Sequence, residues 1–159
     1  MFVPCHCHDE RSNFRGRDAL VRTTELIDYA HELGHKGVAI TNHETISSSL
    51  KANKYITSKM SEEDWKDFKV INGNEIYLCK DLPEGEKPSI FPHFILLAKD
   101  RIGFEQLCIL SNIAWTKNSF MNVMMRVPTY YNDLIEVVSK NKGHLIASTA
   151  CIGGTLGRM

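Results

Sequence analysis

Two histidines near the start of the chain have the spacing of a metal-binding pair. His6 and His8 lie in the stretch 2–10, where a short apolar run precedes them and acidic residues follow. In an extended strand alternate side chains share a face, so both imidazoles point to the same side. Two imidazoles on one face at the carboxyl end of a strand can chelate one metal ion. The alternative is a solvated strand end that carries two ordinary histidines.

Further residues of ligand type recur at the ends of later strands that the sequence predicts. They are His43, Glu75, His93 and Cys151. Functional groups collect at the carboxyl ends of the strands in parallel α/β folds, so these side chains are expected to converge. Nitrogen, oxygen and sulfur donors together suit a cluster of zinc, manganese or iron ions. Glu75 has two carboxylate oxygens and is the candidate to bridge two cations. Such a cluster predicts phosphoester hydrolysis.

Each of these residues also has a structural alternative. His43 could cap the helix that follows it. His93, which follows a proline, could be an exposed strand end, and Cys151 could be a small buried apolar side chain. Cys5 and Cys7 point away from the histidine face and are predicted to be core thiols. The joint pattern of donors at successive strand ends favours the metal cluster over these alternatives.

Composition indicates one ordinary globular domain. The 159 residues can enclose a hydrophobic core, and 43% hydrophobic with 24% charged residues is typical of such proteins. The 19 basic residues balance the 19 acidic ones, so net charge makes no case for nucleic-acid or membrane binding. No apolar run approaches the roughly 20 residues of a membrane span, and no signal peptide is apparent. The 5 cysteines lack a disulfide framework spacing, which predicts a reducing, cytoplasmic compartment.

The elements that must position the ligands alternate between strands and helices. Apolar periodicity predicts helices over 18–33, 45–59, 103–115 and 130–140, the first with Gly34 as its stop. Short apolar runs predict strands at 36–41, 69–78 (broken at Gly73), 93–98 and 143–148, with a loop at 80–92. This order predicts an α/β fold with a largely parallel sheet. Full barrels take about 200 residues or more, so an incomplete barrel or an open sheet is expected.

A series of short motifs runs along nearly the whole chain. They occupy residues 6–8 (H-x-H), 12–18, 37–43 (ending Thr41-Asn42-His43), 73–77 (around Glu75), 93–99 (H-x-x-L-L-A), 126–128 and 148–154 (around Cys151). In this order they resemble the PHP (polymerase and histidinol phosphatase) domain at the N-terminus of the bacterial DNA polymerase III alpha subunit, known also from phage-encoded forms. The resemblance rests on many motifs in the right order, because each one alone is weak.

The resemblance implies a distorted seven-stranded (β/α) barrel, incomplete here because its final strands are missing. It also implies up to three divalent metal ions (zinc, manganese or iron) at the strand carboxyl ends. The positions that match metal ligands are His6, His8, Asp18, His43, Glu75, His93 and Cys151. Asp18 is also the expected N-cap of the helix predicted at 18–33, and a carboxylate at a helix start could serve both roles.

The implied function is that of a replicative DNA polymerase, a DNA-directed nucleotidyltransferase in its full length. The local activity would be metal-dependent phosphodiester hydrolysis of the 3′–5′ exonuclease type. The implied partners are DNA, the remaining polymerase domains and replisome subunits, with no membrane. Two alternatives stay open: an inactive structural module of the polymerase, and a stand-alone phosphoesterase acting on a small phosphate ester. The motifs at 93–99 and 148–154 favour the polymerase over the small-ester enzyme.

Two departures from the family pattern matter. Asn42 stands where the family usually has Asp. We interpret this position as orienting His43 through a hydrogen bond, where Asn is the weaker acceptor, which predicts reduced metal affinity. The sequence also ends at Met159, before the family's last Asp-x-His motif and before any polymerase palm, fingers or thumb. We therefore expect a truncated PHP domain over 1–159, with one strand edge and one flank of the core exposed.

Overall fold

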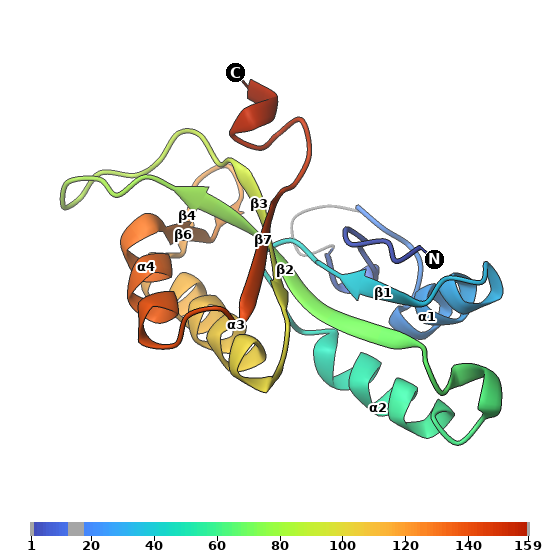
Figure 1. Ribbon diagram of the computed structural model, residues 1–159. Helices are drawn as coiled ribbons and strands as arrows, with labels where there is room; N and C mark the ends of the chain where they lie inside the picture. The colour runs from blue at the N-terminus through green and yellow to red at the C-terminus, as the bar shows by residue number, and fades with distance from the viewer. Residues whose placement is uncertain (1, 13–17, 159) are drawn as a thin grey trace.

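One long strand, β2 (Lys69–Cys79), organises the chain. The computed structural model describes residues 2–12 and 18–158. Within them the main sheet has 5 strands in the order β1-β2-β3-β7, with β6 paired to β2 outside that path. Figure 1 shows β2 running between two groups of helices, with the N-terminal third of the chain on one side.

Different parts of β2 pair with different neighbours. Its first residues pair in parallel with β1 (Gly37–Ile40), and its last residues pair in parallel with β6 (Pro128–Tyr130). Its middle pairs in antiparallel fashion with β3 (His93–Ala98), which pairs in the same way with β7 (Leu145–Thr149). Glu75 lies in the middle section, opposite Ile95.

The sheet is therefore mixed, and the expectation of a largely parallel sheet is wrong. Parallel neighbours need a long crossover connection, usually a helix. The segment that joins β2 to β3 contains no helix, so the chain reverses and the two strands run antiparallel. The sheet is also open within the described residues. Its strand β7 has four of five residues exposed, as expected for an unpaired edge.

Four α-helices occupy the regions where apolar periodicity predicted them. They are α1 (Thr23–Glu32), α2 (Ser49–Lys59), α3 (Arg101–Ile113) and α4 (Tyr131–Lys140). Gly34, with φ of 71°, ends α1 as expected. Both α1 and α2 begin later than predicted. Since α1 begins at Thr23, Asp18 does not cap it.

Shorter elements complete the chain. They are the 3-10 turns η1 (Glu10–Ser12), η2 (Glu63–Trp65) and η4 (Leu156–Arg158), the π-helical turn η3 (Ala114–Asn118), and a hairpin of β4 (Phe120–Met121) with β5 (Met125–Arg126). The hairpin and β6 lie where the sequence pattern predicts no strand. These strands of two or three residues are too short for an alternating pattern to identify them.

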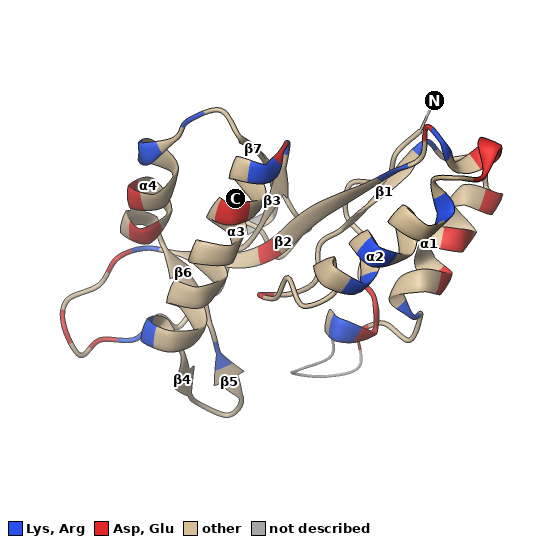
Figure 2. Cartoon of the chain, turned by 90° about the horizontal axis from the view of Figure 1, so that it is seen from below, with Lys and Arg blue, Asp and Glu red and all other residues tan. Residues whose placement is uncertain are grey.

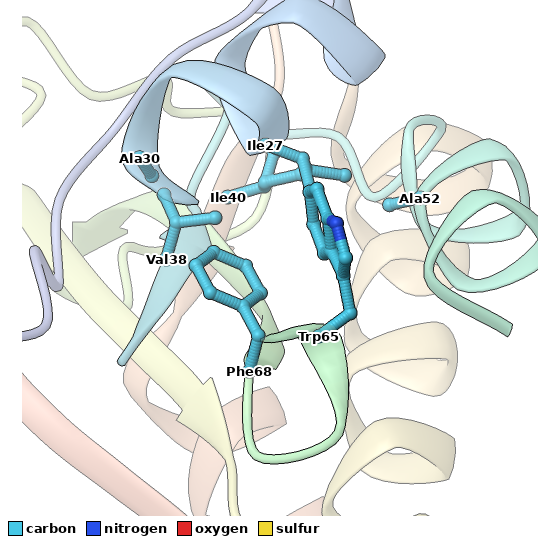
Figure 3. Close-up of a cluster of buried hydrophobic side chains, with 7 residues drawn as sticks. All are labelled: Ile27, Ala30, Val38, Ile40, Ala52, Trp65 and Phe68. Carbon is cyan, nitrogen blue, oxygen red and sulfur yellow. The ribbon is translucent and has the colours of Figure 1, made fainter. Parts of the chain in front are cut away.

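Two apolar clusters anchor the two ends of β2. The first joins α1, α2, β1 and η2, and Figure 3 shows its members: Ile27, Ala30, Val38, Ile40, Ala52, Trp65 and Phe68. The second joins β2 and β3 to α3 and α4; its buried members are Ile76, Leu78, Leu96, Leu107, Leu110 and Val137. Each large side chain buried in this way contributes about 1.5–3 kcal/mol. The centre of β2 is thus held from both sides.

Gly73 lets neighbouring groups approach the centre of β2 closely. A Cβ atom at this position would lie 2.7 Å from Leu97 Cδ2 and 2.8 Å from Thr41 Cγ2. The expected break at Gly73 is therefore wrong, because the strand is continuous through it. The glycine brings β1 and β3 close to β2 two residues before Glu75.

Charged residues lie mostly on helices and loops, as the colours of Figure 2 show. The strand β2 carries a single acidic residue, Glu75. Of the two cysteines predicted to be core thiols, Cys7 is half-buried against the first cluster but Cys5 is exposed, so that prediction is wrong for Cys5. Among the described helices, none has the length and apolar character needed to cross a bilayer.

Tyr55 on α2 contacts Asp28 on α1, and this contact makes the stability of the fold depend on pH. The hydroxyl of Tyr55 donates to Asp28 Oδ1 at 2.6 Å. Burial, the bond to Asp28 and nearby acidic charge raise the pKa of Tyr55 to about 12. The unfolded chain loses this proton near pH 10. Stability should therefore fall as pH rises from 10 to 12.

We predict that Tyr55→Phe loses less stability than the wild type over this interval. Urea unfolding at pH 9, 10, 11 and 12 measures the difference. Tyr29→Phe, at an exposed position on α1, is the control and should follow the wild type. Identical pH profiles for Tyr55→Phe and the wild type would contradict the assignment.

Candidate metal centre

The N-terminal segment lies along β1 but is not a regular strand. Ala39 N–H donates to the carbonyl of Pro4, and Thr41 N–H donates to that of Cys7. Between these two bonds the segment advances three residues, from 4 to 7, while the chain opposite advances two, from 39 to 41, so the segment contains one extra residue there, as in a bulge. Only Cys7, opposite Ile40, makes a β-bridge there. The predicted strand is therefore irregular, yet it still delivers His6 and His8 to the same place.

That place is one oxygen of Glu75. His6 Nε2 lies 3.1 Å from Glu75 Oε2, and His8 Nε2 lies 3.0 Å from the same atom. The two ring nitrogens are 3.0 Å from each other. The Glu75 side chain is 1% exposed, so its carboxylate is almost wholly removed from water.

Two more histidines reach the same carboxylate from the two sides of β2, one after the end of β1 and the other at the start of β3. His43, which follows β1 and makes an isolated bridge to Glu75, places Nδ1 3.1 Å from Oε2. His93, the first residue of β3, places Nδ1 2.9 Å from Oε1. Because β3 is antiparallel to β2, its first residue pairs with Tyr77, two residues beyond Glu75 on β2. The sequence assigned Glu75 to a strand end, whereas it lies at the centre of the strand.

The histidines keep Glu75 ionised despite its burial. Desolvation alone would raise the pKa of this carboxyl group. Hydrogen bonds from His8 and His93, the charge of His43 and the bond from His6 outweigh it, and together hold the pKa of Glu75 well below its usual range. At neutral pH the site therefore contains a buried negative charge surrounded by imidazole nitrogens.

The remaining predicted ligands lie at the margin of this cluster. Cys151, after β7, is exposed and places Sγ 3.4 Å from His93 Nδ1. Asp18 Oδ2 is 4.0 Å from His43 Nε2. The motif at 12–18 falls mostly on residues 13–17, which lie outside the described residues. All seven predicted ligands thus come to one region, although their role as ligands stays a prediction.

The structural alternatives for single residues do not hold. The helix after His43 begins at Ser49, with Ser48 as its N-cap residue, so His43 does not cap it. The side chain of His93 is 24% exposed and faces Glu75 instead of solvent. Cys151 is not buried.

The donor set fits divalent cations. One group consists of His6, His8 and Glu75, another of His43, Glu75 and His93, and in each the ligand atoms lie within 4.8 Å of one another. Neighbouring donors around an ion bound at about 2.1 Å are roughly 3.0–3.4 Å apart in octahedral or tetrahedral geometry. Contacts of 2.9–3.1 Å around Glu75 are close to that spacing. Imidazole with carboxylate suits zinc, manganese or iron.

Asn42 has a different environment from the one expected. In the described part of the chain its side chain bonds to Asp9 and Ser48, not to the ring of His43. Asn42 Nδ2 donates to Asp9 Oδ1 at 2.7 Å, and Asp9 N–H donates to Asn42 Oδ1 at 2.9 Å. Ser48 Oγ also donates to Asp9 Oδ1. This buried cluster ties the residue after His8 to the residue before His43.

Three residues near the site had no sequence signal strong enough to single them out. Asp9 is fully buried in the cluster just described. The buried hydroxyl of Ser12 lies 2.9 Å from His8 Nδ1. Glu44 has φ of 56°, a left-handed conformation that is uncommon for a residue other than glycine, and turns the chain directly after His43. Its Oε1 accepts the Tyr77 N–H at 2.6 Å.

A comparison with protein-family profiles shows the family of the chain. The sequence profile of the PHP domain matches residues 4–159. The chain is 43% identical over 157 residues to a "DNA-directed DNA polymerase" of Bacillus phage SPbeta, covering 95% of this chain and 12% of that protein. It is 29% identical over 159 residues to "DNA polymerase III subunit alpha" of Chlamydia trachomatis, covering 98% of this chain and 11% of that protein.

A solved amidohydrolase from Chromobacterium violaceum superposes with a TM-score of 0.42 at 16% identity, covering 71% of this chain and 34% of that one. The coverages of 12% and 11% given above mean that the chain spans about an eighth of the length of the polymerases that it matches.

The buried contact between Asn42 and Asp9 predicts the effect of an acidic residue at 42. Asn42→Asp replaces the amide donor by a second carboxylate 2.7 Å from Asp9 Oδ1. One of the two must then take a proton, or both remain charged and repel. We predict a loss of about 1–3 kcal/mol of stability at pH 7, smaller near pH 4.

Chemical unfolding of metal-free protein at both pH values measures this loss. Asn112→Asp, at an exposed position of α3, is the matched control and should change stability little. An Asn42→Asp variant as stable as the wild type at pH 7 would contradict the predicted repulsion.

Proposed function

Because the chain belongs to the PHP domain family, we propose that the histidines around Glu75 form a divalent-metal centre that hydrolyses phosphodiester bonds. One observation carries the proposal. A fully buried, ionised carboxylate has both oxygens within about 3 Å of ring nitrogens from separate chain segments. A buried charge is costly unless it is paired or binds a metal, and buried charged clusters of this kind are uncommon as purely structural features.

The residues take distinct roles in this proposal. Glu75 would be the ligand shared by two cations. One cation would be held together with His6 and His8, the other together with His43 and His93, and Cys151 and Asp18 would complete the set. When bound, the cations supply positive charge that stabilises a phosphodiester undergoing attack and makes water a better nucleophile at neutral pH.

The chain's own residues prepare the site for this chemistry. The low pKa of Glu75 keeps the carboxylate negative at neutral pH, so the carboxyl group itself has no proton to lose before cations bind. The histidines come from segments on both sides of β2 that backbone hydrogen bonds hold in place, which limits the variation in the distances between donors. Their side chains are 13–30% exposed, so the centre is open to a substrate from solvent.

We propose DNA as the substrate, cleaved from a 3′ end. The support is that the relatives named above are DNA polymerases. In the same proposal, residues 1–159 act as the PHP domain of a longer replicative polymerase that contributes nucleotidyl transfer and the contacts to DNA and replisome subunits. Closure into the seven-stranded barrel of the family belongs to this proposal too.

The test combines metal content with hydrolysis. The chain is loaded with Mn²⁺ or Zn²⁺, its bound metal is measured by elemental analysis, and a 5′-labelled single-stranded oligonucleotide is followed over time. We predict bound metal and shortening from the 3′ end. Glu75→Gln should lower both metal affinity and rate by about 100-fold or more, since it removes the shared charged ligand.

Glu63→Gln is the matched control, because Glu63 is 93% exposed on η2 and contacts none of the predicted ligands. Circular dichroism of each variant verifies folding. Bound metal without hydrolysis would indicate the structural module instead of the nuclease. Cleavage of p-nitrophenyl phosphate but not of DNA would indicate the small-ester phosphoesterase. Failure to bind metal would refute the proposed centre.

A further inference from the structure

The hydroxyl of Ser12 contacts two predicted ligands at once. Ser12 ends the short turn η1 and is fully buried. Its Oγ lies 2.9 Å from His8 Nδ1 and accepts the backbone N–H of His43 at 3.0 Å. His8 comes from the N-terminal segment, whereas His43 follows β1. One oxygen therefore connects two parts of the site that are 35 positions apart in the sequence.

The ring of His8 is consequently held on both sides. Its Nε2 faces Glu75 Oε2 at 3.0 Å, and its Nδ1 faces Ser12. An imidazole that binds a cation through one nitrogen usually donates a hydrogen bond from the other, which fixes the ring's orientation. His8 has this arrangement within the chain itself.

The position of Ser12 is itself well fixed. Ser12 N–H donates to the carbonyl of Asp9 at 2.9 Å, which closes the turn. Asp9 is anchored in turn by Asn42, by Ser48 and by the N–H of Arg11. Because Asn42 and Ser48 are buried, the hydroxyl is placed before any cation arrives.

We propose that Ser12 is a positioning residue of the metal centre, which presents His8 Nε2 to the cation and holds His43 in register beside it. This inference rests on the metal centre proposed above. It assigns to Ser12 no contact with substrate or cation. Its role is to reduce the freedom that His8 would otherwise lose on binding.

The chemistry of a hydroxyl suits this role. The oxygen can accept the His43 N–H and still either donate to His8 Nδ1 or accept from it. Without a cation, the hydroxyl can donate to Nδ1 while Nε2–H faces Glu75. With a cation at Nε2, the proton must sit on Nδ1, which then donates to Ser12 Oγ. Ser12 thus gives His8 Nδ1 a hydrogen-bond partner in both tautomers, which the methyl side chain of an alanine cannot do.

The test compares Ser12→Ala with Thr41→Val. Thr41 is buried, and its Oγ1 donates to the carbonyl of Cys7 at 3.2 Å, so Thr41→Val removes a bond to the same segment without touching a ring. Affinity for Zn²⁺ is measured by competition with a chelator. We expect Ser12→Ala to weaken it by about 10–100-fold, as loss of a ligand's supporting hydrogen bond does. Thr41→Val should keep the affinity for Zn²⁺ within about twofold of the wild-type value, whatever stability each variant loses.

A second readout uses the unmutated chain, so the test does not depend on the folding of Ser12→Ala. Nitrogen-15 NMR of the histidine rings at pH 8 reports their tautomers. Zinc should move the His8 proton to Nδ1 and give a slowly exchanging ring N–H resonance there. A Nδ1 that stays unprotonated in zinc-loaded protein would overturn the proposal.

The two proposals fail differently. If the wild type binds zinc and Ser12→Ala binds it equally well, the role of Ser12 is overturned while the metal centre stands. If Ser12→Ala and Thr41→Val weaken binding alike, Ser12 acts only through stability, which also overturns the inference. If the wild type binds no metal, both proposals fall together.

Discussion

The burial of Glu75 is the constraint on which the rest of the structure depends. An ionised carboxylate that is 1% exposed is strongly disfavoured unless other groups replace its lost hydration. Here the imidazoles of His6, His8, His43 and His93 do so. The N-terminal segment, the end of β1 and the start of β3 must therefore all converge on the middle of β2. A site of this kind is defined by the fold as a whole, since no two of its histidine-bearing segments are adjacent in the sequence.

The architecture fixes the centre of β2 from both ends. One apolar cluster holds its first half against β1, α1 and α2, and another holds its second half against α3 and α4. Gly73 then allows Thr41 and Leu97 to pack closely beside it. Behind the histidines, the buried polar cluster of Asp9, Asn42 and Ser48 joins the N-terminal segment to the turn after β1. Packing sets the position of the carboxylate, and polar contacts set the positions of the segments around it.

Periodicity and donor type made much of this predictable. The bounds of β3 and the locations of the four helices follow from apolar spacing, and the predicted ligands do meet. Strand direction was not predictable from periodicity, because a period of two is the same in parallel and antiparallel strands. The sequence therefore grouped His93 with side chains at the carboxyl ends of parallel strands, although it begins an antiparallel strand. Glu75 was grouped in the same way, although it lies within β2. The partners of Asn42 and the position of Ser12 depend on a turn and a bulge that only tertiary contacts specify.

The central claim is that Glu75 is the shared ligand of a metal centre. Anomalous diffraction from crystals grown with Mn²⁺ or Zn²⁺ tests it most directly, because it locates the ions without reference to activity. The account predicts strong peaks on both sides of the Glu75 carboxylate, one bound by His6 and His8 and another by His43 and His93. Peaks confined to surface residues, with none at Glu75 in crystals saturated with metal, would contradict it.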